Sequence, residues 1–246
     1  MKKLVLHLES QSALAVLPDS QARISEIIDT LQLPAHRAVL LVVGAAGNLN
    51  PALRPQLAPL FDAVAQVAYE TAAVLLDGGT QAGVMALLGE AVARRAHRPA
   101  LLGVAPAALV SYPGGPATNA PLEPHHSHFV LVEGTDWGDE TATLLDLTTG
   151  LATSPTGPLP VAVLLAGGGG IARNEMVQAA RHRLPVLVIA GTGGLADELA
   201  AAWPHRQTPP EEPKLAEILA NGQLHFFPLD GTPALAQALR QLLQKA

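Results

Sequence analysis

Short runs of valine, leucine, isoleucine and alanine recur along the chain, and each run stops at glycine, proline or a charged residue. Continuous apolar runs of this length are typical of parallel strands that are buried on both faces. We therefore predict strands at residues 4–8, 38–44, 72–76, 100–106, 128–134 and 224–229, and two more that run directly into glycines within segments 161–170 and 185–194.

Between these runs, apolar residues return at intervals of three and four, which is the spacing of one helix face. Ile24, Ile27, Ile28 and Leu31 predict a helix that starts near residue 19 or 20. The same spacing predicts helices over residues 55–71, 82–96 and 139–147, and a closing helix that carries Leu235, Leu239, Leu242 and Leu243. This alternation predicts an α/β fold, with an open, mostly parallel sheet and helices on both faces.

Residues 1–246 have the length of one large α/β domain. We divide the chain into a leading strand and helix at 1–37, a core at 38–203, and a closing strand and helix at 214–246. Proline, glycine, serine and asparagine are frequent in residues 107–127, which predicts a polar loop outside the core, long enough to act as a lid. Residues 203–213 are predicted to form a second surface loop.

Composition and charge exclude several classes of function. The net charge is −6 and the lysines and arginines are scattered, so we expect no nucleic-acid partner and no anionic membrane surface. The chain has no cysteine, which excludes disulfides and cysteine-bound metal and fits a cytoplasmic protein. Polar residues at positions 7 and 9–11 interrupt the apolar stretch at the start of the sequence, so we do not expect this stretch to be a signal peptide that is removed. No later apolar run is long enough to cross a membrane.

Glycine-rich loops follow four of the predicted strands. They read GAAG at 44–47, DGGT at 77–80, GGGG at 167–170 and GTGG at 191–194. In an open parallel sheet such loops share the carboxyl edge, where glycine lets backbone N–H groups approach a phosphate. The loops either make tight turns or form a ligand site; their recurrence favours a site at Gly44, Gly47, Gly78, Gly79, Gly167, Gly168, Gly169, Gly170, Gly191, Thr192, Gly193 and Gly194.

Polar side chains near these loops are further candidates for ligand contacts. Asp77 and Glu133 follow predicted strands and could each accept hydrogen bonds from a ribose, or instead cap a helix. Thr80 and Gln81 lie at a predicted helix start, where they could add to backbone contacts with phosphate. Glu175 and Arg173 follow the GGGG loop; an acid there could assist cleavage of an N-glycosidic bond, or simply belong to a solvated helix turn.

Three histidines, His125, His126 and His128, lie close together in the sequence. Neighbouring positions on an extended segment point to opposite faces, and neither a cysteine nor a paired carboxylate accompanies them, so we expect no metal site. His126 is instead expected to hydrogen-bond within its loop and His128 to pack at the start of a strand, with one of them as a possible ligand contact.

Several motifs, taken in order, resemble a known group of proteins. DGGTQAGVMALLGEA at 77–91 with GVAP at 103–106 resembles the SLOG superfamily, which includes cytokinin-activating phosphoribohydrolases of the lysine-decarboxylase-like type and the DNA-processing protein of natural transformation. HSHFVLVEG at 126–134, WGDE at 137–140, LAGGGG at 165–170 and AGTGGLADEL at 190–199 are more similar to the amino-terminal SLOG (LSDAT-type) domain of melastatin-type TRP channels and its prokaryotic relatives.

This resemblance implies a Rossmann-like domain that senses a nucleotide-derived ligand such as ADP-ribose or NAD, with no required cofactor and with an effector protein that the sequence does not identify. The chain departs from the phosphoribohydrolase pattern PGGxGTxxE. Here the loop reads AGGGGIARNE, with Ala166 for proline, Ile171 for threonine and Glu175 one place late. The catalytic arrangement of those enzymes therefore does not transfer residue by residue.

Three hypotheses follow. The first is a ligand sensor that binds an adenine-nucleotide derivative on the glycine loops. The second is an enzyme, a nucleotide N-glycosidase or phosphoribohydrolase assisted by Glu175. The third is a non-catalytic assembly module in which the glycines are structural. Because the mean hydropathy is +0.28 and surface charge is sparse, we also expect a homo-oligomer.

Overall fold

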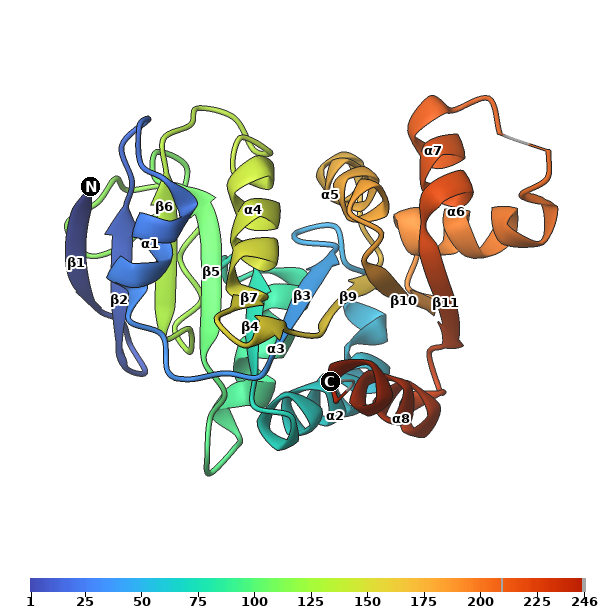
Figure 1. Cartoon of the computed structure of the whole chain (residues 1–246), viewed down its shortest axis with the longest axis horizontal. Coiled ribbons are helices and arrows are strands. Elements are labelled where there is room, and N and C mark those ends of the chain that lie inside the picture. Colours follow the sequence, from blue (N-terminus) through green and yellow to red (C-terminus); the bar gives the residue numbers. More distant parts are fainter. Residues whose placement is uncertain (209, 245–246) are drawn as a thin grey trace.

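The computed structural model describes residues 1–208 and 210–244, and one nine-stranded sheet runs through the described chain (Figure 1). In spatial order the strands are β1 (Lys2–His7), β2 (Ser12–Leu17), β6 (His128–Val132), β5 (Leu101–Pro106), β4 (Ala73–Asp77), β3 (Ala38–Gly44), β9 (Val161–Ala166), β10 (Pro185–Ala190) and β11 (Gln223–Pro228). Only the β1–β2 pair is antiparallel, so the predicted mostly parallel α/β sheet is confirmed.

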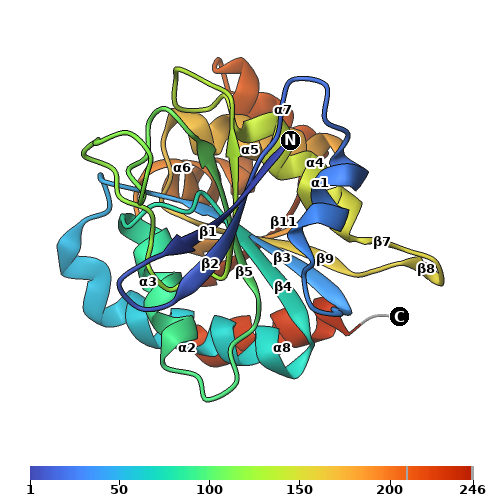
Figure 2. The same cartoon turned by 90° about the vertical axis from the view of Figure 1, so that its left-hand side faces the viewer.

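Helices cover both faces of this sheet (Figures 1 and 2). One face packs against α1 (Ile24–Leu31), α4 (Thr141–Leu151), α5 (Gly170–Arg181), α6 (Gly194–Ala202) and α7 (Pro213–Asn221). The other packs against α2 (Arg54–Glu70), α3 (Gly83–Ala93) and α8 (Thr232–Leu243). The interior strands are buried on both faces, which is why their sequences are continuous apolar runs.

The order in which the chain adds strands to the sheet reverses between β3 and β9. From β3 the chain proceeds outward through β4, β5 and β6, whereas from β9 it proceeds through β10 and β11 toward the other edge. β3 and β9 are paired from Val39–Val161 to Gly44–Ala166, and the loops that leave their carboxyl ends lead to opposite faces of the sheet. A crevice forms where adjacent loops diverge in this way, and ligands of open α/β sheets bind there.

Several elements differ from the sequence-based expectations. Strand β2 was not predicted, and neither were α7 and a small hairpin of β7 (Thr153–Ser154) and β8 (Gly157–Pro158). The first helix starts at Ile24 rather than near residue 19 or 20.

The 107–127 loop is not wholly outside the core. Val110, Leu122 and His126 are buried, and the loop packs over the sheet through backbone bonds such as Glu123 N–H to the Gly79 carbonyl at 2.9 Å. Its ends are therefore fixed to the fold. In the described residues, no helix is both long and apolar enough to cross a bilayer.

Candidate functional site

A cavity of about 450 Å³ opens between the ends of β3 and β9, where the strand order reverses. Its walls are residues 44 and 46–48 after β3, residues 78 and 80–82 after β4, the first turn of α5 from Gly169 to Ala172, and residues 119–121 of the long loop. The lining is completed by Val42, Val43, Met85, Trp137, Glu140 and Glu175. The cavity is therefore formed by loops that are far apart in the sequence.

The first turn of α5 supplies backbone donors to this cavity. Gly169 is its N-cap residue, and within the described residues no side chain caps the helix. The first N–H groups of an α-helix have no partner inside the helix, and together with the helix dipole they attract anions. Gly169 and Gly170 lack side chains that would cover these groups, so α5 presents an open anion-binding end to the cavity.

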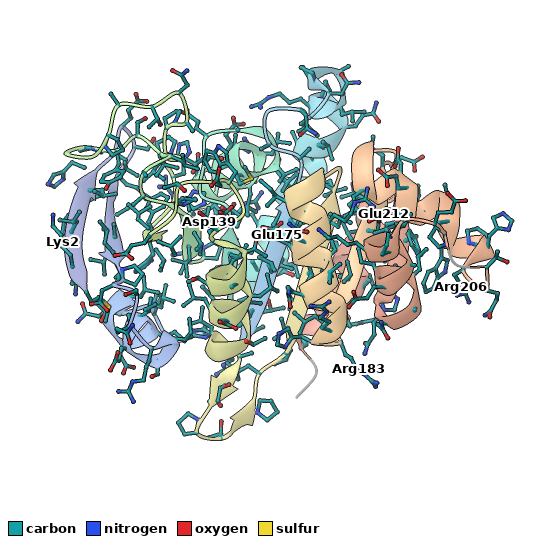
Figure 3. All side chains as sticks on the ribbon, turned by 90° about the horizontal axis from the view of Figure 1, so that it is seen from above. Lys2, Asp139, Glu175, Arg183, Arg206 and Glu212 are labelled. Carbon is teal, nitrogen blue, oxygen red and sulfur yellow. The ribbon has the colours of Figure 1, made fainter. Side chains whose placement is uncertain are left out.

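Two carboxyl groups face the same space. Glu140 lies at the N-cap position of α4 and accepts a hydrogen bond from the Gly138 N–H at 2.8 Å, while Glu175 lies on the buried side of α5. Burial raises the pKa of Glu175 to about 8, with added contributions from the negative charges of Glu140 and Asp77. Burial also raises the pKa of Glu140. Glu175, which is labelled beside α5 in Figure 3, is therefore mostly protonated at neutral pH.

The rest of the lining is apolar or neutral. Met85 and Ile171 form apolar walls, and Trp137 lies at the cavity with 45% of its surface exposed. No lysine, arginine or histidine of the described chain lines the cavity. Neutralisation of a bound anion consequently depends on backbone N–H groups rather than on basic side chains.

A second cavity of about 270 Å³ lies beside the first and shares Asn48 with it. It is lined by the glycines at 167, 168, 191, 193 and 194, but three of its backbone donors are already occupied. Asp197 accepts hydrogen bonds from the N–H groups of Gly191 at 2.6 Å and Gly193 at 3.0 Å, and Thr192 Oγ1 accepts one from Gly167 N–H at 2.7 Å. These loops are bound to one another.

Comparison with known proteins agrees with this architecture. Residues 37–238 match the family described as SLOG in TRPM, prokaryote. The chain belongs to this SLOG family. The SLOG chain is also 25% identical over 224 residues to the transient receptor potential cation channel subfamily M member-like 2 of Nematostella vectensis, a match that covers 76% of this chain and only 14% of the channel.

The fold of this SLOG chain is also found in a solved structure. The crystal structure of the protein TM1055 superposes with a TM-score of 0.52 at 18% identity and covers 82% of this chain and 99% of that one. At this level of identity the likeness establishes the shared fold. The family assignment confirms the resemblance that the motifs indicated.

The glycines predicted to form one site in this SLOG chain divide between the two cavities. Gly44, Gly47, Gly78, Gly169 and Gly170 line the larger cavity with Thr80 and Gln81, whereas Gly167, Gly168, Gly191, Thr192, Gly193 and Gly194 line the smaller one. Gly79 lines neither. Its φ is +68°, and a Cβ there would lie 2.9 Å from the Cα of Gly103, so Gly79 allows two strand ends to pack together.

Three other predicted side chains lie outside both cavities. Glu133 is exposed, and Arg173 forms ion pairs with Glu198 at 2.6 Å and Glu212 at 3.0 Å that join α5 to α6 and α7. The catalytic role predicted for Arg173 is therefore not supported by its position. His128 contacts Ser127 Oγ at 2.8 Å, and its burial lowers its pKa to about 4.

Asp77 is fully buried beneath the site rather than in it. Its Oδ1 accepts a hydrogen bond from Gly79 N–H at 2.7 Å and lies 2.8 Å from His126 Nε2. The predicted contact of Asp77 with a ribose, and that of His126 with a ligand, are thus replaced by a contact between the two residues. Among the described residues no group of histidine and acidic side chains has the arrangement of a metal site.

Trp137, Glu140, Asn48 and Asn119 line the cavity but were not predicted as site residues. Trp137 and Glu140 belong to the WGDE motif that supported the family resemblance, so that motif could have identified them. Glu175 was predicted as a site residue, and the sequence also contains a pattern that indicates its burial. It follows Ala172 by three positions and precedes Ala179 by four, which places an acid on the apolar face of a helix.

Proposed function

We propose that the larger cavity binds a nucleotide-derived phosphorylated molecule, with its phosphate at the N-terminus of α5. The observation that carries this proposal is the uncapped start of α5. It faces a cavity at the point where the strand order reverses, between β3 and β9. Helix N-termini at such points are favourable phosphate sites. The family assignment supports a nucleotide-related role for the same region.

The remaining lining suits the other parts of such a ligand. The indole of Trp137 offers an aromatic surface on which a base can stack, an interaction worth about 1–3 kcal/mol per base. Glu140, Asn48 and Asn119 can accept hydrogen bonds from sugar hydroxyls. Because the lining holds two carboxyl groups and no basic side chain among the described residues, each additional phosphate raises the electrostatic cost of binding.

A thermal-shift titration tests the proposal. AMP, ADP-ribose, NAD and ATP are added to the purified protein, and AMP is expected to stabilise it most because AMP carries one phosphate. At a ligand concentration of roughly one hundred times Kd, the expected stabilisation is about 2.7 kcal/mol, or a rise in Tm of roughly 5–11 °C for a chain of this length. No shift with any of these compounds at millimolar concentration would contradict the proposal.

A second candidate is hydrolysis of the N-glycosidic bond, favoured by the placement of Glu140 and Glu175 in one cavity. Water attacks C1′ of the ribose and loses a proton to the Glu140 carboxylate, while the bond from C1′ to the base breaks and the base receives the proton of Glu175. The products are the free base and a ribose phosphate. The raised pKa of Glu175 suits the proton donor.

Chromatography of AMP after incubation with the protein tests this second candidate. Hydrolysis is expected to release adenine at a rate that falls as pH rises through about 8, because Glu175 then loses the proton that it must donate. Glu175→Gln is expected to lower the rate by roughly 10²–10⁴-fold. Thermal stabilisation by AMP without any release of adenine at high protein concentration would exclude hydrolysis and leave the binding proposal intact.

A further inference from the structure

A buried cluster of Asp77, His126 and Glu123 lies behind the cavity wall. His126 is fully buried, and its Nε2 lies 2.8 Å from Asp77 Oδ1 while its Nδ1 lies 2.8 Å from Glu123 Oε2. The ring stacks on Phe129 at a centroid distance of 5.3 Å. Neither the binding proposal nor the hydrolytic mechanism uses these three residues.

The cluster connects two walls of the cavity. On one side, Asp77 Oδ1 accepts the Gly79 N–H at 2.7 Å, next to Gly78 and Thr80 of the lining. On the other, Glu123 follows the lining segment 119–121. Backbone hydrogen bonds join the two walls: Gln81 N–H donates to the Pro121 carbonyl at 2.8 Å and Glu123 N–H to the Gly79 carbonyl at 2.9 Å. The geometry of both walls thus depends on the distance between Asp77 and Glu123.

Two carboxylates buried this close repel each other unless a cation separates them. Burial opposes a charge on His126, but the charges and hydrogen bonds of Asp77 and Glu123 outweigh it and raise the pKa of His126 to about 9. His125 also contacts Glu123, at 2.6 Å, and Glu175 of α5 interacts electrostatically with Asp77. α3 contributes Gly89 against Glu123, and β6 contributes the uncharged Phe129.

We infer that His126 is a positioning residue: as an imidazolium it donates one hydrogen bond to each carboxylate and thereby holds together the cavity walls at 78–81 and 119–121. Loss of that proton leaves one ring nitrogen without a hydrogen to donate, so one carboxylate loses its hydrogen bond from His126 and the walls separate. The effect on the walls concerns the free protein, whereas its effect on ligand affinity rests on the proposed function.

Amide hydrogen exchange by NMR tests the inference without a ligand. Glu175→Gln serves as the parent, because it removes the titration of the neighbouring acid. His126→Gln in this parent is expected to lower the protection of the Gly79, Gln81 and Glu123 amides by at least about tenfold, while amides of β9 and β10 keep theirs. His128→Gln is the matched control, since the half-buried His128 ring lies in hydrogen-bond contact with Ser127 Oγ rather than with Asp77 or Glu123, and it should leave the three amides protected. Equal protection with and without His126 would overturn the inference.

A pH titration gives a second readout that does not depend on whether His126→Gln folds. In the parent, the protection factors of the Gly79 and Gln81 amides are expected to fall as pH rises through about 9, together with the ¹⁵N shifts of the His126 ring. A ring that is neutral at pH 7, or amides that do not follow its titration, would overturn the inference.

AMP affinity, measured by calorimetry, then links the walls to the ligand. His126→Gln is expected to weaken AMP binding by at least about tenfold. If amide protection falls while AMP affinity stays the same, the link to the ligand is wrong. If the wild-type protein itself does not bind AMP, the proposed function fails, and the exchange data still decide the role of His126.

Discussion

Gly169→Asp is expected to weaken the binding of phosphorylated ligands by at least about tenfold without lowering the stability of the fold. Gly169 is the N-cap of α5, its φ of −119° suits any residue, and a Cβ there would have Asn48 Nδ2 at 3.8 Å as its nearest neighbour. An aspartate at this position can accept the free N–H groups of the first turn, which stabilises a helix by a few tenths of a kcal/mol relative to glycine. The same groups are then closed to phosphate, and AMP affinity should fall by at least about tenfold.

The comparison variant is Gly169→Ala, which adds a Cβ but no acceptor. It should retain AMP affinity to within about threefold, since the first-turn N–H groups of α5 stay free. Calorimetry measures AMP affinity and thermal unfolding measures stability for both variants. Undiminished binding in Gly169→Asp would show that the phosphate does not lie at α5.

Gly83→Ala is expected to destabilise the protein by about 3 kcal/mol or more, a fall in Tm of at least roughly 6 °C. Gly83 is the first residue of α3 and has a φ of +51°, where an L side chain is strained. Its Cβ would also overlap the carbonyl oxygens of Ala45 and Ala46. The close approach of Gly83 to these carbonyls joins α3 to the loop after β3. A hydrogen bond from the Val84 N–H to the Ala45 carbonyl, at 3.0 Å, joins the same two segments.

Gly47→Ala is the matched control for this effect. Gly47 lies in the same loop, but a Cβ there would meet no atom within 4 Å, so the change in stability should stay within about 0.5 kcal/mol. Thermal or chemical unfolding measures both variants. Equal stability of the two would contradict the packing described for α3.

The fold could largely be predicted because the interior strands are buried on both faces and carry polar residues only at their ends, such as Asp77 and His128. Strand β2 was missed because it is only partly buried near the sheet edge, so its residues Ser12–Leu17 resemble an interrupted apolar leader. Helix α7 follows a proline-rich segment that indicates a loop. The buried ends of the 107–127 loop depend on distant partners, such as Gly79 for Glu123, which local composition does not reveal.

The site could be predicted only in part. Glycine at strand ends indicates where a backbone can approach an anion, but not whether another residue already occupies its donors. Asp197 and Thr192 occupy donors of the smaller cavity. Arg173 lies two residues before Glu175, yet it reaches Glu198 and Glu212 on other helices instead of the cavity. Such choices of partner are made by tertiary packing.

Asp197 acts on the smaller cavity as an intramolecular competitor. Its carboxylate is tethered beside the N–H groups of Gly191 and Gly193, so its effective concentration there is of millimolar order or higher, and a free anion must exceed that to displace it. Removal of this carboxylate, as in Asp197→Ala, would free the N–H groups of Gly191 and Gly193 for an anion from solution.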